Sequence, residues 1–310
     1  IKDYPNVPLL YNISGACYKA LGQLDAAVKY FEQALAIKPD YADAHYNLGN
    51  TLNELGQLDA AVKSYEQALA IKPDYAEVHS NLGNTLKELG QLDAAVKHFE
   101  QALAIKPDYA DAHYNLGNTL TELGQLDATV KHFEKALVIK PDFAEVHYNL
   151  GNTLKELGQL DAAVKCFKKA LSIDASNQLF WAGFSNVLRA IRFKSFDDSM
   201  VPYFLQALQQ PSIRPQEISI AIISMLKHHP SLHIALETCK TNTIKDKTNQ
   251  LASQLTSIPL LLQMMELCPL PDTKIERLLR LIRQATLNQL TDETIELGNL
   301  AFYVALALHC

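Results

Sequence analysis

The sequence predicts an all-α protein, in which a solenoid of helical hairpins is followed by an irregular helical bundle. A near-identical unit occurs five times, and each copy carries the string LGQLDAAVK or, once, LGQLDATVK. The glycine of that string returns every 34 residues, and a proline follows at the same period in four copies. Periods of roughly 20–50 residues are typical of arrays whose units are single supersecondary elements. One helical hairpin cannot bury its apolar face alone, so the copies are expected to stack into one continuous core.

Each unit is expected to fold as two helices, and the second copy illustrates the reasoning. Apolar residues at spacings of three and four predict a first helix over 42–55. Gly56 ends this helix, since glycine accepts the left-handed conformation that a helix C-terminus needs. Asp59 is expected to cap a second helix over 60–71, and Pro73 to stop it.

The columns shared by all copies carry a family resemblance. In the second copy they are occupied by Leu48, Gly49, Gly56, Ala61, Tyr65, Ala68 and Pro73. This pattern resembles the signature of the tetratricopeptide repeat (TPR) family. The resemblance implies a right-handed TPR solenoid whose first helices line a concave surface. Gly49 and Ala61 would let the two helices approach closely, and Tyr65 would fill the space between hairpins.

The chain is expected to have four parts in sequence order. Residues 1–6 are expected to be the remnant of a preceding helix, and residues 7–177 to form five TPR repeats. Residues 178–210 are expected to form a degenerate sixth hairpin that closes the array, because the apolar pattern continues while the glycine turn is lost. Residues 211–310 form a non-repeat helical region, and the chain is expected to be a fragment of a longer protein.

The apolar pattern of the sixth hairpin is carried by Trp181, Phe184, Leu188, Phe204, Ala207 and Leu208. Beyond it, helices are expected over 216–227, 247–257, 273–290 and 292–308. Asp272 and Thr291 are expected to cap the last two of these helices.

Charge and composition exclude several classes of function. The net charge of −6 argues against a nucleic-acid-binding protein, which should be basic. The excess lies in the repeats, where residues 1–177 carry 16 Lys and Arg against 23 Asp and Glu. No apolar run is long and unbroken enough for a membrane span. The five cysteines are scattered, as in a reducing compartment, so a cytoplasmic protein is expected.

A ladder of asparagines on the first helices is the main candidate binding feature. Its members are Asn47, Asn50, Asn81, Asn84, Asn115, Asn118, Asn149 and Asn152. Amide side chains donate and accept, so such a ladder can hold an extended peptide by its backbone. This resembles the asparagine ladder in the superhelix of O-GlcNAc transferases. The alternative is that the amides bond the neighbouring hairpin and stiffen the array. In the first copy Ile13 and Ala16 occupy these columns, which predicts a groove poorer in amides there.

Further inner columns suggest which peptides would bind. The candidate peptide contacts are Tyr46, Tyr114 and Tyr148, together with Asp43, Glu77, Asp111 and Glu145. Tyrosine is common at interfaces, and the carboxylates, with a further glutamate column, predict an acidic groove. The expected partner is therefore a protein or extended peptide that is neutral or basic rather than acidic. TPR domains that hold the acidic tails of chaperones use inner Lys and Arg, which these columns lack.

No cofactor or metal is expected. His45, His79, His113 and His147 form a column, for which packing is favoured over metal binding because neighbouring repeats stack too far apart for two rings to share an ion. His98, His132 and Cys166 form a second column that is expected to face outward. After Asn177 the chain holds two glycines, too few for a nucleotide-binding loop.

The predicted function is a protein- or peptide-binding scaffold without catalytic activity of its own. The alternative is a substrate-recruiting arm of a glycosyltransferase or methyltransferase whose catalytic domain lies outside this chain. Residues 267–310 resemble the helical segment between the repeats and the methyltransferase domain of some bacterial proteins. Self-association through the N-terminal end is also expected, since Leu9, Leu10, Ile13 and Tyr18 supply an apolar face.

Overall fold

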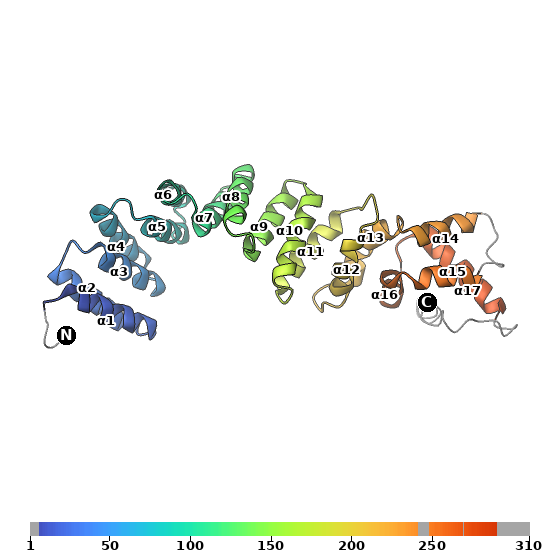
Figure 1. The fold of residues 1–310 in the computed structure, drawn as a ribbon, viewed down its shortest axis with the longest axis horizontal. Helices are drawn as coiled ribbons and strands as arrows, with labels where there is room; N and C mark the ends of the chain where they lie inside the picture. Colours follow the sequence, from blue (N-terminus) through green and yellow to red (C-terminus); the bar gives the residue numbers. More distant parts are fainter. Residues whose placement is uncertain (1–5, 241–247, 269, 290–310) are drawn as a thin grey trace. The chain divides into compact units, whose positions relative to one another are not determined.

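In the part of the chain that the computed structural model describes, all regular secondary structure is helical (Figure 1). The described residues are 6–240, 248–268 and 270–289, with side chains described for 6–237, 250–268 and 270–282. The chain divides into two units, Ile1–Thr153 and Leu154–Cys310, which are described separately.

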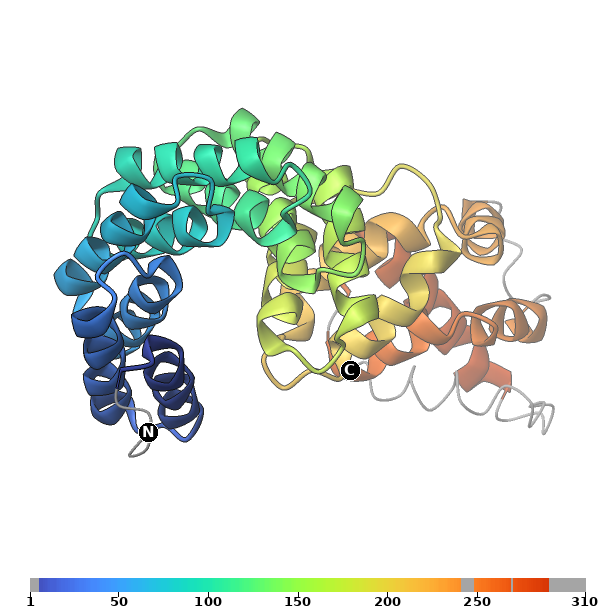
Figure 2. The ribbon, with the colours of Figure 1, turned by 60° about the vertical axis from the view of Figure 1, so that its left-hand side comes forward.

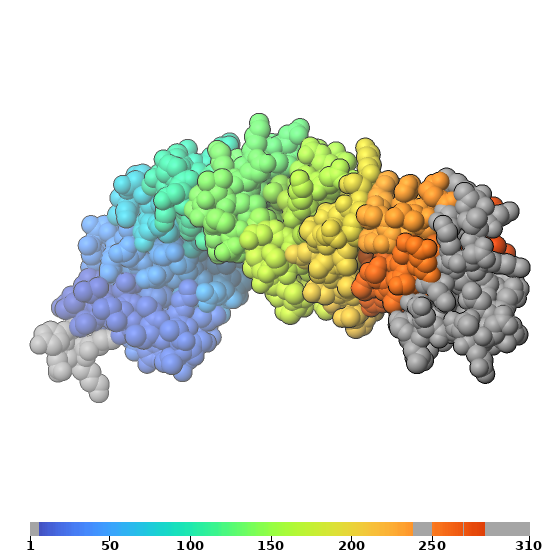
Figure 3. Space-filling view, turned by 45° about the vertical axis from the view of Figure 1, so that its right-hand side comes forward, coloured from blue at the N-terminus to red at the C-terminus, as the bar shows by residue number. Residues whose placement is uncertain are grey.

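The first unit is a solenoid built from successive helical hairpins, as the repeat pattern predicts. Its helices are α1 (Pro8–Ala20), α2 (Leu24–Ile37), α3 (Ala42–Glu54), α4 (Leu58–Ile71), α5 (Ala76–Glu88), α6 (Leu92–Ile105), α7 (Ala110–Glu122), α8 (Leu126–Ile139) and most of α9 (Ala144–Glu156). The second helices α2, α4 and α6 each contact both their own first helix and the first helix of the next hairpin. Figure 2 shows these helices, coloured blue to green, as a curved stack of pairs. The space-filling view shows their surface as continuous (Figure 3).

The turn inside each hairpin depends on a glycine in the left-handed region. Gly56 has φ +72°, and the four equivalent glycines lie between +72° and +75°. The Gly56 N–H donates to the Asn53 carbonyl and the Gln57 N–H to the Leu52 carbonyl, both at 2.9 Å. The predicted role of this glycine is confirmed. The predicted cap at Asp59 is wrong, because α4 begins at Leu58 and places Asp59 inside its first turn. In the first turn its carboxylate still interacts favourably with the positive end of the helix dipole.

A second glycine column allows the two helices of each hairpin to touch. A β-carbon placed on Gly49 would lie 2.6 Å from Cε1 of Tyr65, closer than packed carbon atoms come. Gly15, Gly83 and Gly117 meet Phe31, Phe99 and Phe133 in the same way. These four aromatic rings are among the largest fully buried side chains of the described chain. The close approach predicted at Gly49 is therefore confirmed.

The second unit continues with helices of less regular length. They are α10 (Leu160–Ile173), α11 (Gln178–Ala190), the 3-10 turn η1 (Asp198–Met200), α12 (Val201–Leu208), α13 (Pro215–Leu226), α14 (Pro230–Lys240), α15 (Thr248–Thr256), α16 (Pro259–Leu267) and α17 (Thr273–Gln289). All six apolar residues predicted to continue the repeat pattern are buried. The indole N–H of Trp181 donates to the carbonyl of Ala175 at 2.8 Å, which fixes the start of α11.

The helices near the C-terminus agree in part with the prediction. Asp272 caps α17, since its Oδ1 accepts the N–H groups of Lys274 and Ile275. Helices α14 and α16 were not predicted. Both start at a proline, a residue that suits the first helical turn because its missing N–H would have no partner there. The predicted helix over 292–308 and its cap Thr291 lie outside the described residues, as do residues 1–5 of the predicted N-terminal remnant.

Candidate binding groove

The first helices of the first unit line an open groove of about 690 Å³. Its lining residues are Lys19, Asn50, Asn53, Glu54, Tyr65, Asn81, Asn84, Lys87, Glu88, Asn115 and Glu122. Only Tyr65 comes from a second helix. The lining is therefore polar and repeats along the array, as expected for the inner face.

The groove includes part of the predicted set of contact residues. Asn50, Asn81, Asn84 and Asn115 line it, whereas the other predicted asparagines, tyrosines and carboxylates do not. Sequence reasoning missed Lys19, Asn53 and Tyr65 as lining residues. Asn53 could have been found from helix geometry, because it lies three residues after Asn50 and so on the same face.

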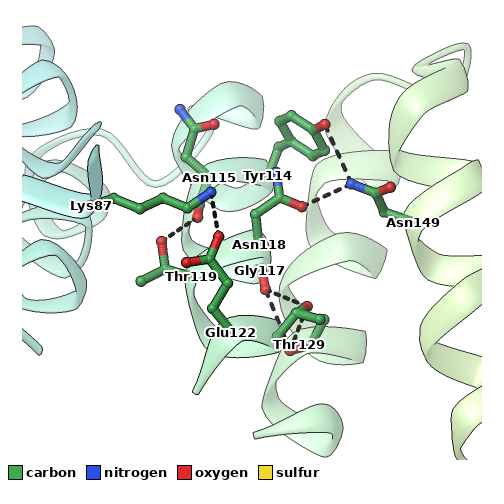
Figure 4. A network of polar contacts seen from close by, with 10 residues as sticks. Lys87, Tyr114, Asn115, Gly117, Asn118, Thr119, Glu122, Thr129 and Asn149 are labelled. Carbon is green, nitrogen blue, oxygen red and sulfur yellow. Dashed lines mark hydrogen bonds and ion pairs between the residues drawn. The ribbon is translucent and has the colours of Figure 1, made fainter. Parts of the chain in front are cut away.

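Most of the ladder is occupied by hydrogen bonds between neighbouring hairpins. Nδ2 of Asn81 donates to Asn50 Oδ1 at 2.8 Å and lies 3.3 Å from the Tyr46 hydroxyl. Figure 4 shows the same arrangement two repeats later, where Asn149 reaches Asn118 and Tyr114 at 2.8 and 3.3 Å.

The Asn47 amide also bonds to the preceding hairpin: its Nδ2 donates to Asn12 Oδ1 at 3.0 Å. Asn12 stands 35 residues before it, in the column that holds tyrosine in three of the four later copies. At three junctions, therefore, the amides stiffen the array, as the alternative interpretation predicted.

One junction departs from this pattern. The residue 35 positions before Asn115 is Ser80, which has no phenol to reach the amide. Among the described residues, neither the Asn115 nor the Asn84 side chain has a hydrogen-bond partner, and Figure 4 shows no contact from the Asn115 amide. In the preceding repeat, by contrast, Tyr65 also donates to Asn50 at 2.7 Å, while its counterpart near Asn84 is Phe99. Two free amides thus line the middle of the groove.

The groove carries a small negative charge. Two ion pairs cross it, Lys19 to Glu54 at 2.9 Å and Lys87 to Glu122 at 3.0 Å. The second is drawn in Figure 4. In both pairs the lysine stands 35 residues before the glutamate. The residue 35 positions before Glu88 is Asn53, which donates to Thr85 Oγ1 at 2.9 Å, so Glu88 has no lysine partner among the described residues. The lining therefore holds two lysines and three glutamates, a net charge of −1.

The predicted carboxylate column lies outside the groove lining and has its own contacts. Asp43 accepts a hydrogen bond from the Tyr75 hydroxyl at 3.2 Å. Glu77 lies 3.6 Å from the Lys106 ammonium group. Asp111 and Glu145 are exposed. The remaining predicted residues outside the lining, Asn152 and Tyr148, are half-buried.

The histidine column packs as predicted and also secures the preceding loop. Nε2 of His79 lies 3.0 Å from the Pro73 carbonyl, which can only accept, so His79 donates from Nε2. His45, His113 and His147 make the equivalent bond, at 2.9 to 3.2 Å.

The second histidine column does not face outward, which corrects the prediction for His98 and His132. Nδ1 of His98 lies 3.1 Å from Nδ1 of His79, and His132 pairs with His113 at the same distance. When both rings are neutral and His79 carries its proton on Nε2, His98 donates from Nδ1 to Nδ1 of His79. The 19-residue spacing shared by both pairs is the one feature of the sequence that could have indicated them.

These histidine pairs predict a loss of stability in mild acid. Burial lowers the pKa of His98 and of His113, and burial with the nearby His113 and Lys135 lowers the pKa of His132 from 6.5 to about 4. Between these values the unfolded chain binds more protons than the folded one, so the free energy of unfolding falls as pH drops from 6.5 toward 4.

The control comes from the second repeat, where the same position holds Ser64. In urea titrations we expect the wild type to lose more stability between neutral pH and pH about 5 than the His98→Ser/His132→Ser variant, whose two titrating rings are gone. Equal losses would show that the pairs do not titrate on unfolding.

Two other kinds of site are absent from the described residues. They contain no group of three or more His, Cys, Asp and Glu side chains placed to hold a metal ion. None of their helices has the length and apolar character needed to cross a membrane.

Family models match the repeat region of this chain. Those described as TPR repeat match residues 15–54, 49–90, 83–124 and 117–158, and one described as Tetratricopeptide repeat matches 144–177. Together they span more than half of the chain. No curated protein sequence matches at a significant level.

Solved structures share the same fold. A MamA protein is 28% identical with a TM-score of 0.51, over 55% of this chain and 92% of that one. YrrB, described as a TPR protein with an unusual peptide-binding site, is 22% identical with a TM-score of 0.51, over 59% and 94%. PilF of Pseudomonas aeruginosa is 21% identical with a TM-score of 0.57, over 68% and 95%. At these identities the last two show the fold alone.

Proposed function

The chain belongs to the tetratricopeptide repeat family, and on that premise we propose that it is a scaffold whose first-unit groove binds an extended peptide of a partner protein. The observation that carries the proposal is the pair of free amides, Asn84 and Asn115, in the middle of an open polar groove. An extended peptide leaves its N–H and C=O groups unpaired, and asparagine can serve both.

The charge of the groove favours a neutral or basic peptide. The two lysines that line it are already paired with glutamates, so they are not available to an acidic tail. An acidic peptide would in addition face the unpaired Glu88. We therefore expect acidic peptides to be rejected.

Two other interpretations of the sequence stay predictions. A transferase-recruiting role depends on sequence outside this chain. Self-association through the N-terminal end has partial structural support, since Leu9 and Ile13 are 52% and 49% exposed. Tyr18 does not belong to that face, because its ring stacks on Tyr30 at 4.9 Å.

The test of the proposed function is selection from a random dodecapeptide library followed by anisotropy titration of the selected peptides. Asn84→Ala with Asn115→Ala is expected to weaken binding on the order of tenfold, since two hydrogen bonds of about 1 kcal/mol each are lost in part to water. Lys97→Ala with Lys131→Ala, on exposed second-helix positions, is the control and should change little.

The bonded asparagines should behave differently from the free ones. Asn81 and Asn149 hold neighbouring hairpins together, so their replacement by alanine should lower stability before it lowers affinity. If the lysine control variant and the Asn84/Asn115 variant weaken the binding of the selected peptides equally, the groove is not the binding surface.

A further inference from the structure

We propose that Glu88, Asn84 and Asn115 form a subsite that binds one arginine side chain of an extended peptide. This inference depends on the proposed function and adds to it the position in the groove and the kind of side chain recognised. It follows from two gaps in the repeating contacts that meet on α5. The asparagine hydrogen bond is missing between α5 and α7, and the ion pair that would engage Glu88 is missing between α3 and α5.

The three side chains face the same space. Asn84 and Glu88 are four residues apart on α5, which puts them on one face of that helix. Asn115 belongs to α7, the first helix of the next hairpin, and all three line the groove. The separation of 31 residues between Asn84 and Asn115 is the one at which Asn50 bonds Asn81 and Asn118 bonds Asn149. The free pair therefore stands where bonded pairs stand elsewhere.

The sequence explains why this pair is free. At the bonded junctions a tyrosine hydroxyl, from Tyr46 or Tyr114, lies 3.3 Å from the same nitrogen that reaches the neighbouring asparagine. The phenol thus helps to hold that amide toward its partner. Ser80 is short and only 2% exposed, so it cannot reach the Asn115 amide in the groove.

The unpaired groups at this subsite are mainly hydrogen-bond acceptors. Two amide oxygens and one carboxylate are available, and the nearest lysine in sequence, Lys87, is engaged with Glu122 at 3.0 Å. Asn53, which stands where a lysine would neutralise Glu88, donates to Thr85 instead.

Arginine fits these acceptors better than the other basic side chain. A guanidinium presents five N–H donors in a planar fork, so it can pair with a carboxylate and still reach two amide oxygens. A lysine ammonium has three donors around one point and is more strongly hydrated. We therefore expect arginine to be preferred over lysine at this subsite.

The experiment uses three blocked serine–threonine peptides that differ at one central residue: arginine, lysine or citrulline. Citrulline has the shape of arginine without its charge. Binding to the full chain is followed by NMR titration of isotope-labelled protein, which detects weak affinities. We expect the arginine peptide to bind on the order of tenfold more tightly than the citrulline peptide at low salt, with lysine between them. The side-chain amide signals of Asn84 and Asn115 should shift most.

Two variants separate the subsite from the rest of the groove. Glu88→Gln should remove the preference for arginine over citrulline, while Glu134→Gln, an equal charge change on an exposed second-helix position, should keep it. Ser80→Tyr supplies the phenol present at the bonded junctions and should join Asn115 to Asn84, which lowers the affinity for the arginine peptide. Glu88 is exposed, so its variant should fold even if Ser80→Tyr does not.

Each outcome decides a separate point. Equal binding of the arginine and citrulline peptides, no measurable binding of the arginine peptide, or a preference that survives Glu88→Gln overturns the subsite. The proposed function would still stand in those cases if library-selected peptides depend on Asn84 and Asn115. If those selected peptides are also insensitive to the groove variants, the proposed function fails as well.

Discussion

Ala95→Trp is expected to destabilise the first unit by at least about 1–3 kcal/mol, through overpacking of a filled core. Ala95 lies on α6 with no exposed surface, in a cluster with Phe99 and Leu82. Because Ala95 is fully buried, an indole ring at this position must push the neighbouring side chains and hairpins apart. Solenoid stability is a sum of repeat and neighbour terms, so damage in the third repeat should divide the array into parts that unfold separately.

The measurement is urea denaturation followed by circular dichroism, with Lys97→Trp as the control. Lys97 is two residues away on the same helix and exposed, so the same indole should cost little there. If Ala95→Trp unfolds in a single transition at the wild-type midpoint, the stacked packing described for this repeat is wrong.

Gly117→Ala should cost on the order of 1–3 kcal/mol, because the new methyl group would lie 2.5 Å from Cε1 of Phe133. Phe133→Leu should relieve this clash, so the double variant should be more stable than the sum of the single effects predicts. Gly124→Ala provides the contrast. Its cost comes from a φ of +72° with nothing within 4 Å of the added atom, so Phe133→Leu should not relieve it.

The two cycles are compared by urea denaturation of the wild type, the three single variants and the two double variants. We expect a favourable coupling between Gly117→Ala and Phe133→Leu. Between Gly124→Ala and Phe133→Leu we expect the free-energy changes to be additive. Additivity in both cycles would mean that the aromatic ring does not limit how closely the two helices approach.

The repeat architecture could be predicted from the sequence because its rules are local. Gly56 needs a left-handed turn and Gly49 a close neighbour, and both needs repeat every 34 residues. Helix starts were harder to predict. Asp59 has the residue type of an N-cap, but the helix begins two residues earlier than predicted and Gln57 stands at the N-cap position.

The candidate site was less predictable, because it depends on differences between copies rather than on what they share. The asparagine columns look uniform in sequence, yet Asn81 and Asn149 are bonded while Asn115 is free. The deciding residue is Ser80, whose effect requires knowing that the residue 35 positions earlier lies beside the amide. The pairing of His98 with His79 likewise needs the packing of two helices to be seen.

Photo-cross-linking tests most directly whether the first-unit groove binds peptides. p-Benzoylphenylalanine is placed either at Asn53, in the groove lining, or at Val138, which is 82% exposed on α8. The library-selected peptides are then added and irradiated. We predict covalent capture of the peptides from position 53 and none from position 138. Capture from position 138 with none from position 53 would contradict the proposal that this groove is where the protein binds its partner.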